Sequence, residues 1–367
     1  MTRLADRYGA INLAQGFPDF AAPVNVKAAA IRAIEEDFNQ YAVTWGSPRL
    51  RGAIAEKAEW FNGIHADPDR NVTVTCGSTE AMMASVMALA DSGDEVVMFE
   101  PAYENYGPAA ILAGATPRPV PLGPDFDLDE ESLKSVLNKR TKLVIVNTPH
   151  NPSGKVFARG DLKVIADLCE DSGAIAITDE IYEHILYDGR KHVSLATLGD
   201  MGNKTVTISG ISKTYTATGW RIGYAIADEA LTNAIRKVHD YMTLCAPSPL
   251  QEAAAFALRL PKSFYSDLAV SYQEKRNLVV KGLHDIGFEF FLPEGSYYIL
   301  ADFSGLSSLG DVKFATSMII ECGVAVVPGS SFYKDPRKGR KLVRFSYSKR
   351  ETTLVNALSK MKAFFCS

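Results

Sequence analysis

Lys213 follows a short β-rich run, Thr205 to Ser209, and precedes an apolar run that begins at Arg221 and extends to Ala227. A lysine amine can form a Schiff base with an aldehyde, and burial among apolar groups lowers its pKa so that it can do so. A lone lysine in a loop is more often an ordinary surface residue, so this feature alone is only moderately specific. Four further stretches carry side chains that could act together with this amine.

The first of these stretches, Cys76 to Glu80, follows a strand-like run and begins a helix-like one. The free N–H groups and the positive dipole end of a helix N-terminus suit a phosphate. Gly77 permits close approach of the backbone to such an anion, and Ser78 and Thr79 supply hydroxyl groups. In isolation, a plain helix cap at Ser78 or Thr79 is the simpler interpretation.

The other stretches also follow or form strand-like runs. Between Asn147 and Gly154, prolines stiffen a loop that carries two asparagine amides. Between Thr178 and Glu183, Asp179 ends an apolar run, which favours chemistry somewhat over an acid pair at a helix N-terminus. Arg221 and Arg344 can each bind a phosphate or a carboxylate through two parallel hydrogen bonds.

Together these stretches resemble class I pyridoxal-phosphate (PLP) aminotransferases of fold type I. Ser212 to Gly223 is similar to the lysine loop of that family, S-K-x-x-x-x-x-G-x-R-x-G, and Asn147 to Gly154 to its N-x-P-x-N-P-[ST]-G. The matches run in family order from Asn12 to Arg344. Five sequence segments resemble, more narrowly, the branch of this family that contains the kynurenine/glutamine transaminases and the methionine aminotransferases. They are NLAQGFPDF, NQYA, KTYTATGWRIGY, IRKVHDYMT and VAVVPGSSFY.

The resemblance implies that Lys213, Asp179 and Tyr182 are the catalytic residues. Lys213 would hold PLP as a Schiff base and move the proton, and Asp179 would keep the pyridine nitrogen protonated, which makes the ring an electron sink. The other expected cofactor contacts are the phosphate contacts Gly77, Ser78, Thr79 and Arg221, the ring-oxygen contacts Asn151 and Tyr182, Tyr103 stacked on the ring, and Tyr41 reaching the phosphate of a neighbouring subunit.

The same resemblance assigns the substrate side. Arg344 would bind the α-carboxylate together with Asn151, and Gly16 and Phe17 would lie over the substrate. One departure from the family is Gly210, where many members carry a serine whose hydroxyl touches the phosphate. We expect Ser212 among the cofactor contacts, although Ser209 could equally replace the missing hydroxyl.

The elements that position these residues alternate between strand-like and helix-like runs. Runs that are apolar on both faces and alternate with helices predict a mostly parallel sheet covered on both sides. Such sheets bind ligands at the carboxyl ends of their strands, where the candidate residues gather. The predicted strands are Asn71–Thr75, Glu95–Phe99, Lys142–Asn147 and Ala174–Thr178, and the predicted helices are Glu80–Asp91 and Asp161–Asp171.

The last third of the chain changes character and predicts a smaller α+β domain. Its predicted elements are a long helix, Pro261–Ile286, the strands Tyr297–Asp302, Val324–Val327 and Leu342–Ser346, and a final helix, Glu351–Phe364. The resemblance adds the N-terminal segment to this domain. We therefore expect an α/β protein of fold type I, with a large domain at 26–255, built on a mostly parallel sheet of the seven-stranded type, and a small domain at 1–25 and 256–367.

Composition narrows the class of protein. The 367 residues are 47% hydrophobic and carry a net charge of −4, without a basic stripe, which speaks against a nucleic-acid or membrane partner. The five cysteines are scattered and odd in number, and the histidines show no metal-ligand spacing, so we expect no disulfide framework and no metal. No signal peptide or apolar span is visible, and we expect a cytoplasmic protein.

The implied reaction is a ping-pong transamination from an L-amino acid to a 2-oxo acid in a homodimer. The branch suggests an aromatic amino acid, methionine, glutamine or kynurenine as donor. Two alternatives keep the cofactor: a cysteine-conjugate or cystathionine β-lyase, and an aspartate or diaminopimelate-type aminotransferase. A ligand-sensing regulator domain is disfavoured because the strip beginning at Asn12 leaves no room for a winged helix, and a non-catalytic homologue is disfavoured by the retained site residues.

Overall fold

The computed structural model describes residues 1–366, and its central sheet has seven strands in the order β2-β8-β7-β6-β5-β3-β4. Neighbouring strands are parallel except where β8 pairs with β2 and β7. This confirms the predicted mostly parallel sheet. The strands are β2 (Val72–Thr75), β3 (Glu95–Glu100), β4 (Thr116–Pro121), β5 (Thr141–Asn147), β6 (Ile175–Asp179), β7 (Thr205–Gly210) and β8 (Gly223–Ile226).

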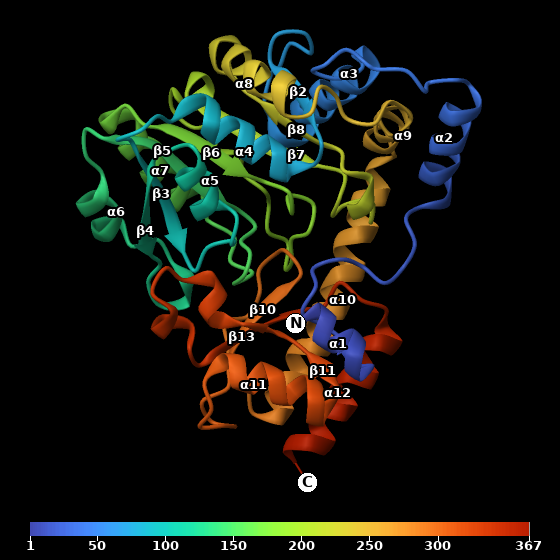
Figure 1. Ribbon diagram of the computed structural model, residues 1–367, viewed down its shortest axis with the longest axis vertical. Helices are drawn as coiled ribbons and strands as arrows, with labels where there is room; N and C mark the ends of the chain where they lie inside the picture. Colours follow the sequence, from blue (N-terminus) through green and yellow to red (C-terminus); the bar gives the residue numbers. More distant parts are fainter. Residues whose placement is uncertain (367) are drawn as a thin grey trace.

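Helices cover both faces of this sheet (Figure 1). Successive side chains of a strand point to opposite faces, and Val96 and Val97 of β3 accordingly lie in two different core clusters. The cluster around Val96 contains residues of α4 (Ser78–Leu89), α5 (Tyr106–Leu112) and α8 (Glu229–Met242). The cluster around Val97 contains residues of α6 (Glu130–Val136) and α7 (Arg159–Ser172).

Local chemistry sets the bounds of α7. Its apolar residues Leu162, Ile165, Ala166 and Cys169 recur at helical spacing and are all buried. At its start, the carboxylate of Asp161 accepts a hydrogen bond from the Ala158 N–H at 3.0 Å, and its end is Gly173 at φ 73°. The predicted helix, Asp161–Asp171, is therefore confirmed, with a slightly longer span.

A third group of helices packs at the β2 edge of the sheet. It comprises α2 (Val24–Glu35), α3 (Pro48–Lys57) and α9 (Ser248–Leu258). Val26, Leu50 and Ala254 share one core cluster with Val72 of β2. In α3, Ser47 caps the helix by accepting from the Leu50 N–H at 3.2 Å.

The last third of the chain forms a smaller antiparallel sheet in the order β12-β13-β10-β9. The predicted strand Val324–Val327 is wrong, because the chain splits there into two strands that join different sheets. β11 pairs with the N-terminal strand and β12 with β13, partners that an apolar run by itself does not specify. The elements are β9 (Glu289–Phe290), β10 (Tyr298–Asp302), α11 (Asp311–Ser317), β11 (Val324–Ala325), β12 (Val327–Pro328), β13 (Leu342–Ser346) and α12 (Glu351–Phe365).

The N-terminal segment lies beside this smaller sheet (Figure 1). It contains α1 (Thr2–Tyr8) and β1 (Ile11–Asn12), which pairs with β11 in parallel. The long helix α10 (Lys262–Ile286) connects the large sheet with the smaller one. Near its start, the hydroxyl of Tyr265 forms a 2.7 Å hydrogen bond with the hydroxyl of Tyr215, which precedes β8. Near its end, Leu283 lies in the core of the smaller sheet. Among the described residues, no helix has the length and apolarity to cross a membrane.

Candidate active site

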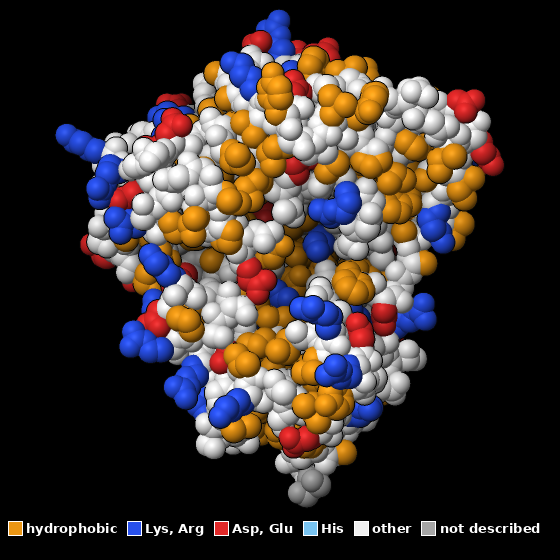
Figure 2. Space-filling view, in the orientation of Figure 1, with side chains coloured by type: hydrophobic (Ala, Val, Ile, Leu, Met, Phe, Trp, Pro, Cys, Tyr) orange, Lys and Arg blue, Asp and Glu red, His pale blue; other side chains and the backbone are white. Residues whose placement is uncertain are grey.

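A cavity of about 660 Å³ opens between the large sheet and the smaller one. Figure 2 shows this face of the molecule hollowed near its centre, with Lys and Arg side chains at the hollow. Most of the residues that the sequence singles out line the cavity: Gly16, Ser78, Thr79, Tyr103, Asn151, Asp179, Tyr182, Ser212, Lys213, Arg221 and Arg344.

The topology of the large sheet explains why these residues meet. β2, β5, β6 and β7 run in the same direction, so their carboxyl ends lie at one edge, the usual ligand-binding edge of such sheets. β8 runs the opposite way, which brings its amino end to that same edge. The connection from β7 to β8 therefore carries both Lys213 and Arg221 into the cavity.

One end of the cavity brings a helix N-terminus and an arginine together, an arrangement that suits an anion. Gly77, at φ 82°, is the N-cap of α4, and Ser78 and Thr79 form its first turn at the cavity wall. A Cβ at Gly77 would overlap the Arg221 guanidinium, and one at Gly223 would overlap the backbone of Gly77 and Ser78. The cation and the helix N-terminus are thus packed together as closely as glycine allows. The alternative in which Ser78 or Thr79 caps the helix is wrong, since both lie inside it.

The two serines beside Gly210 have different surroundings. Ser212 lines the cavity, whereas the buried Ser209 donates its hydroxyl proton to Glu183 Oε1 at 2.6 Å, away from it. A Cβ at Gly210 would lie 2.8 Å from the Ile222 carbonyl oxygen and 2.9 Å from Gly223 Cα, so a serine at this position would not fit without movement. Of these two serines, Ser212 is therefore the one that lines the cavity.

Asp179, the last residue of β6, points its carboxylate into the cavity between two donors. The Tyr106 hydroxyl donates to Oδ2 at 2.8 Å, and the Ile181 N–H donates to Oδ1 at 3.3 Å. Burial raises the pKa of Asp179, while these two hydrogen bonds and the charge of Lys213 act in the opposite direction. The aspartate is thereby held in one orientation with donors that stabilise its charged form.

Asn151 is fixed to the same strand end. Its N–H donates to the Asn147 side-chain oxygen at 2.7 Å, and the Asn147 amide donates to the Asp179 carbonyl oxygen at 2.8 Å. Both asparagines line the cavity. The proline-rich loop is thus a rigid support for two amides rather than an ordinary surface turn.

Lys213 is one of the residues that line the cavity. Its Nζ donates to the Gly16 carbonyl oxygen at 3.1 Å and stands 5.9 Å from the centre of the Tyr182 ring. Burial lowers the pKa of this amine, an effect that the nearby Tyr298 and Asp179 partly oppose. A lowered pKa increases the neutral, nucleophilic fraction of the amine.

Arg344 faces the cavity from β13 on the opposite side. Its Nη1 donates to Asn151 Oδ1 at 2.8 Å, and its Nη2 donates to the Ala14 carbonyl oxygen at 3.0 Å. A guanidinium has more N–H groups than these two bonds use, and Arg344 Nε is buried without a partner in residues 1–366. Donors that the protein leaves unpaired in a cavity are suited to a ligand carboxylate.

Three predicted site residues lie outside the cavity wall of this chain. Gly77 is beneath it, in contact with Arg221. Phe17 is 44% exposed and packs under the Lys349 amine, and Tyr41 is 80% exposed on the surface. Contacts of Phe17 with a substrate and of Tyr41 with a second subunit stay predictions.

The structure adds wall residues that the sequence does not single out. Tyr106 lies three residues after Tyr103, a spacing that would place both near one side of a helical turn. Tyr298 reaches the cavity from β10 of the smaller sheet, and the α1 residues reach it beside the pairing of β1 with β11, contacts that no local pattern in the sequence specifies. The added residues that matter below are Tyr106, Tyr298, Arg3, Gln15, Asn105 and Ser331.

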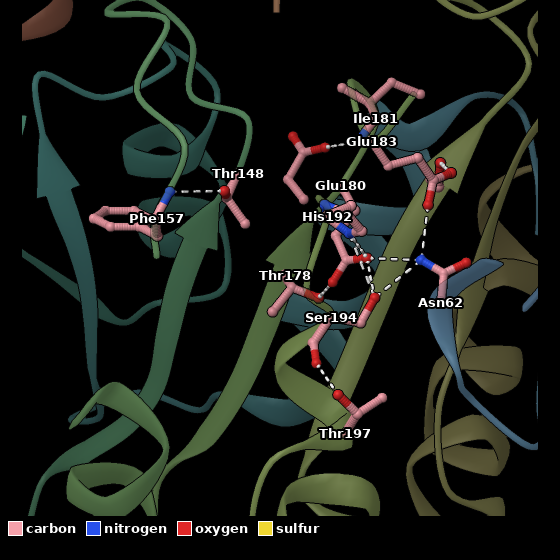
Figure 3. Close-up of polar contacts among 12 residues, drawn as sticks. Asn62, Thr148, Phe157, Thr178, Glu180, Ile181, Glu183, His192, Ser194 and Thr197 are labelled. Carbon is pink, nitrogen blue, oxygen red and sulfur yellow. Dashed lines mark hydrogen bonds and ion pairs between the residues drawn. The ribbon is translucent and has the colours of Figure 1, made fainter. Parts of the chain in front are cut away.

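A buried polar network supports the turn that carries Tyr182 (Figure 3). Glu180 Oε2 accepts from Ser194 at 2.6 Å and from the Asn62 amide at 3.1 Å, and it pairs with His192 at 2.6 Å. Burial would raise the pKa of Glu183, but chiefly the Lys57 ammonium at 2.5 Å lowers it to about 2. The alternative of an acid pair at a helix N-terminus is wrong, because turns follow Asp179 and Glu180 belongs to this network.

The groups that line the cavity fit PLP. An anion site at a helix end, a buried amine whose pKa is lowered, a buried carboxylate and an arginine with unpaired N–H groups open on one space. These are the groups that a phosphorylated aldehyde with a basic ring nitrogen and an amino acid would each require. The glycines at 77 and 223 allow Arg221 and the N-terminus of α4 to pack against each other, where they would hold the phosphate.

Comparison with known proteins agrees with this geometry. The family model "Aminotransferase class I and II" matches residues 8–361. The chain is 38% identical to a methionine aminotransferase of Escherichia coli, over 99% of this chain and 94% of the relative, and 33% identical to human kynurenine–oxoglutarate transaminase 1, over 96% and 92%. The solved structure of N-succinyldiaminopimelate aminotransferase from Mycobacterium tuberculosis superposes with a TM-score of 0.97 at 37% identity, covering 99% of this chain and 95% of that one. The chain therefore belongs to the aminotransferase class I and II family, and it is a transaminase that uses pyridoxal 5'-phosphate.

Proposed function

We propose that this enzyme moves the amino group of an L-amino acid to a 2-oxo acid by a ping-pong mechanism in which Lys213 is both the cofactor-binding amine and the proton-transfer group. The observation that carries the proposal is that Lys213, Asp179 and Arg344 open on one cavity from three separate elements. When bound, PLP supplies an aldehyde carbon for the amine and a ring that delocalises electrons.

The roles of the chain's own residues follow from their contacts. Arg344, held by Asn151, would bind the substrate carboxylate through its remaining N–H groups. Lys213, once free, would remain beside Gly16 and move the proton at the substrate Cα. Asp179, fixed by Tyr106, would hold the proton on the ring nitrogen, and Tyr182 would donate to the ring oxygen.

The cavity wall supports a donor with a neutral side chain. Apart from the groups already assigned and the charged residues Arg3 and Glu104, the wall offers apolar residues and uncharged polar ones, which suit the aromatic, methionine, glutamine or kynurenine side chains of the proposal. The named relatives include a methionine aminotransferase and kynurenine–oxoglutarate transaminases. The wall residues in question are Met82, Val327 and Pro328 on the apolar side and Gln15, Asn105 and Ser331 on the polar side.

One observation favours a second candidate, an aspartate or diaminopimelate-type aminotransferase. Arg3 of α1 also lines the cavity, is exposed, and is in no ion pair within residues 1–366, so its guanidinium is available to a carboxylate on the substrate side chain. Relatives named for aspartate and N-succinyldiaminopimelate are 37% identical to the chain. Glu104 at the same wall opposes an acidic side chain, which is why this candidate ranks second.

The experiment that ranks these functions is the absorbance of the PLP-loaded enzyme with single amino acids and no acceptor. Bleaching of the visible band, with restoration by a 2-oxo acid, would support the transaminase, and the fastest donors would name the substrate class. Rapid bleaching by aspartate rather than methionine would favour the second candidate. Pyruvate release from a β-substituted cysteine without acceptor, while the band persists, would instead support the β-lyase.

We also propose the assembly and the domain division that the resemblance implied. Exposed apolar side chains on α2 and the segment after it support a homodimer, in which Tyr41 would reach the partner's cofactor: Ile31, Ile34, Phe38 and Tyr41. The pairing of β1 with β11 supports a small domain at 1–25 and 256–367 beside a large one at 26–255. A cytoplasmic location stays part of this proposal.

Capture of PLP by the cofactor-free enzyme should depend on the pKa of Lys213. Because burial lowers that pKa, the neutral amine becomes available below the pH at which an ordinary lysine would lose its proton. The rate of appearance of the visible band should therefore rise with pH to a plateau, with a midpoint below 10.5. Stopped-flow absorbance between pH 6 and 11 measures it, and a midpoint at or above that of free lysine would contradict the assignment.

Replacing Gly223 with alanine should weaken PLP binding by about tenfold or more, since overlap with a backbone costs roughly 1–3 kcal/mol. The new methyl group would push against Gly77 and Ser78, the anion-binding turn. Gly219→Ala is the matched control, because its Cβ would meet nothing within 4 Å in the same connection. Equilibrium dialysis with PLP gives both affinities, and equal weakening in the two variants would count against a phosphate site at this turn.

A further inference from the structure

Tyr298, the first residue of β10, touches both halves of the cavity. It is 3% exposed and lines the wall, and it pairs across the sheet with Ser346 of β13. Arg344 lies two residues before Ser346, so its side chain is on the same face of the sheet as Tyr298 and diagonally beside it. The sequence shows no motif at this position, and the roles assigned above do not use it.

The hydroxyl of Tyr298 contacts the cofactor side. It lies 3.1 Å from the Tyr182 hydroxyl, and a Cβ at Gly16 would overlap it, so the glycine makes room for this oxygen. Burial, followed by the neighbouring Tyr298, raises the pKa of Tyr182 well above its usual range, which keeps the Tyr182 phenol protonated and able to donate.

The aromatic ring of Tyr298 contacts the substrate side. Its centre is 4.3 Å from Cζ of Arg344, within the range of a cation–π contact. The ring of Phe332 lies 5.0 Å from the same carbon. Together with the two hydrogen bonds from Arg344 to Asn151 and Ala14, the rings define where the unpaired N–H groups of this arginine point.

We propose that Tyr298 is a positioning residue with two separable contacts, its hydroxyl orienting Tyr182 toward the cofactor oxygen and its ring orienting Arg344 toward the substrate carboxylate. This rests on the proposed roles of Tyr182 and Arg344. Each phenol has one proton to donate. If Tyr298 donates to the Tyr182 oxygen, the proton of Tyr182 is free to point into the cavity, where the cofactor's ring oxygen would accept it.

The direction of the effect follows from hydrogen-bond polarisation. A phenol that accepts one bond becomes a stronger donor in the next. Without the Tyr298 hydroxyl, Tyr182 would stabilise a negatively charged ring oxygen less well, and the bound cofactor would lose its proton at a higher pH. The ring contact acts on a different quantity, the affinity for a carboxylate, because it preorganises Arg344.

Two variants separate the contacts. Tyr298→Phe keeps the ring and removes the hydroxyl, so the pH midpoint of the bound cofactor's absorbance should rise by a few tenths of a unit while carboxylate affinity stays within about twofold. Tyr298→Leu removes both, so the midpoint should rise similarly and the Kd of an unreactive acid, 3-phenylpropanoate, should increase about three- to tenfold. Absorbance titrations measure both quantities without turnover.

A double-mutant cycle distinguishes positioning from a general structural role. Tyr182→Phe should raise the midpoint more than Tyr298→Phe does, and adding Tyr298→Phe to it should cause no further rise. An unchanged midpoint in Tyr298→Phe, an additive rise in the double variant, or an equal loss of carboxylate affinity in the Phe and Leu variants would each overturn the proposal. Failure of the transaminase proposal itself would show as absent amino-acid bleaching, a separate readout.

Discussion

Replacing Lys213 with alanine is expected to remove the visible band of the bound cofactor and to lower turnover by about 10⁴-fold, the upper range for a lost general acid–base group. Lys213 is the amine that lines the cavity with a pKa lowered by burial, and its Nζ lies beside the N-terminal strip that would cover the substrate. Steady-state assays with the preferred donor and a 2-oxo acid measure the loss.

Lys275→Ala is the matched control for that experiment. Burial lowers the pKa of Lys275 as well, yet its amine packs on Phe20 and Tyr272, outside the cavity wall. This variant should retain the visible band and ordinary turnover. Normal turnover by Lys213→Ala, or an equal loss in both variants, would contradict the role given to Lys213.

Replacing Asp179 with asparagine is expected to have the second largest effect, a loss of turnover of roughly 10²–10³-fold, as for other preorganised charges that stabilise a transition state. The amide has nearly the same shape but no negative charge with which to hold a proton on the ring nitrogen. The Tyr106 hydroxyl and the Ile181 N–H both donate to the carboxylate, one to each oxygen. In the asparagine variant, one of these two donors would face an NH₂ group, which cannot accept its hydrogen bond. Single-turnover absorbance with one amino acid isolates this step from acceptor binding.

Two further variants at this contact test whether the negative charge of Asp179 is the property that matters. Asp179→Glu keeps the charge and should retain more activity than Asp179→Asn, although its longer side chain disturbs the fit. Tyr106→Phe removes one donor to the carboxylate and should cost about tenfold, since losing a partner of a buried charged group costs roughly 1–3 kcal/mol. Asparagine outperforming glutamate would show that the charge at this position is not what matters.

The sheet and its binding edge could be predicted because their signals are local. β5 and β6 read as apolar runs that end at Asn147 and Asp179, so both the strands and the polar groups at their ends were visible in the sequence. The position of Gly77 to Thr79 between a strand and a helix could be predicted for the same reason, and the phosphate contact proposed for it stays a prediction. The capping interpretation failed because the glycine, not a serine, is the cap.

The way in which side chains from distant parts of the chain meet in the cavity could not be predicted, because it depends on long-range strand pairing. Tyr298 and Arg344 meet because β10 pairs with β13 in one particular register, and the sequence does not encode that register in any short pattern. The split of Val324–Val327 into two strands has the same origin, because its partners lie far away in the chain. Ser209 and Ser212 could be told apart only once the buried Glu183 was seen beneath Ser209.

The most direct test of the central claim is to locate the cofactor. The PLP-loaded enzyme would be reduced with borohydride, digested, and examined by mass spectrometry for a lysine carrying the reduced cofactor. The expected result is one modified peptide containing Lys213, at about one cofactor per chain, which disappears when PLP is omitted. Modification mainly at another lysine, or at none while activity persists, would contradict the assignment of the cavity as the active site.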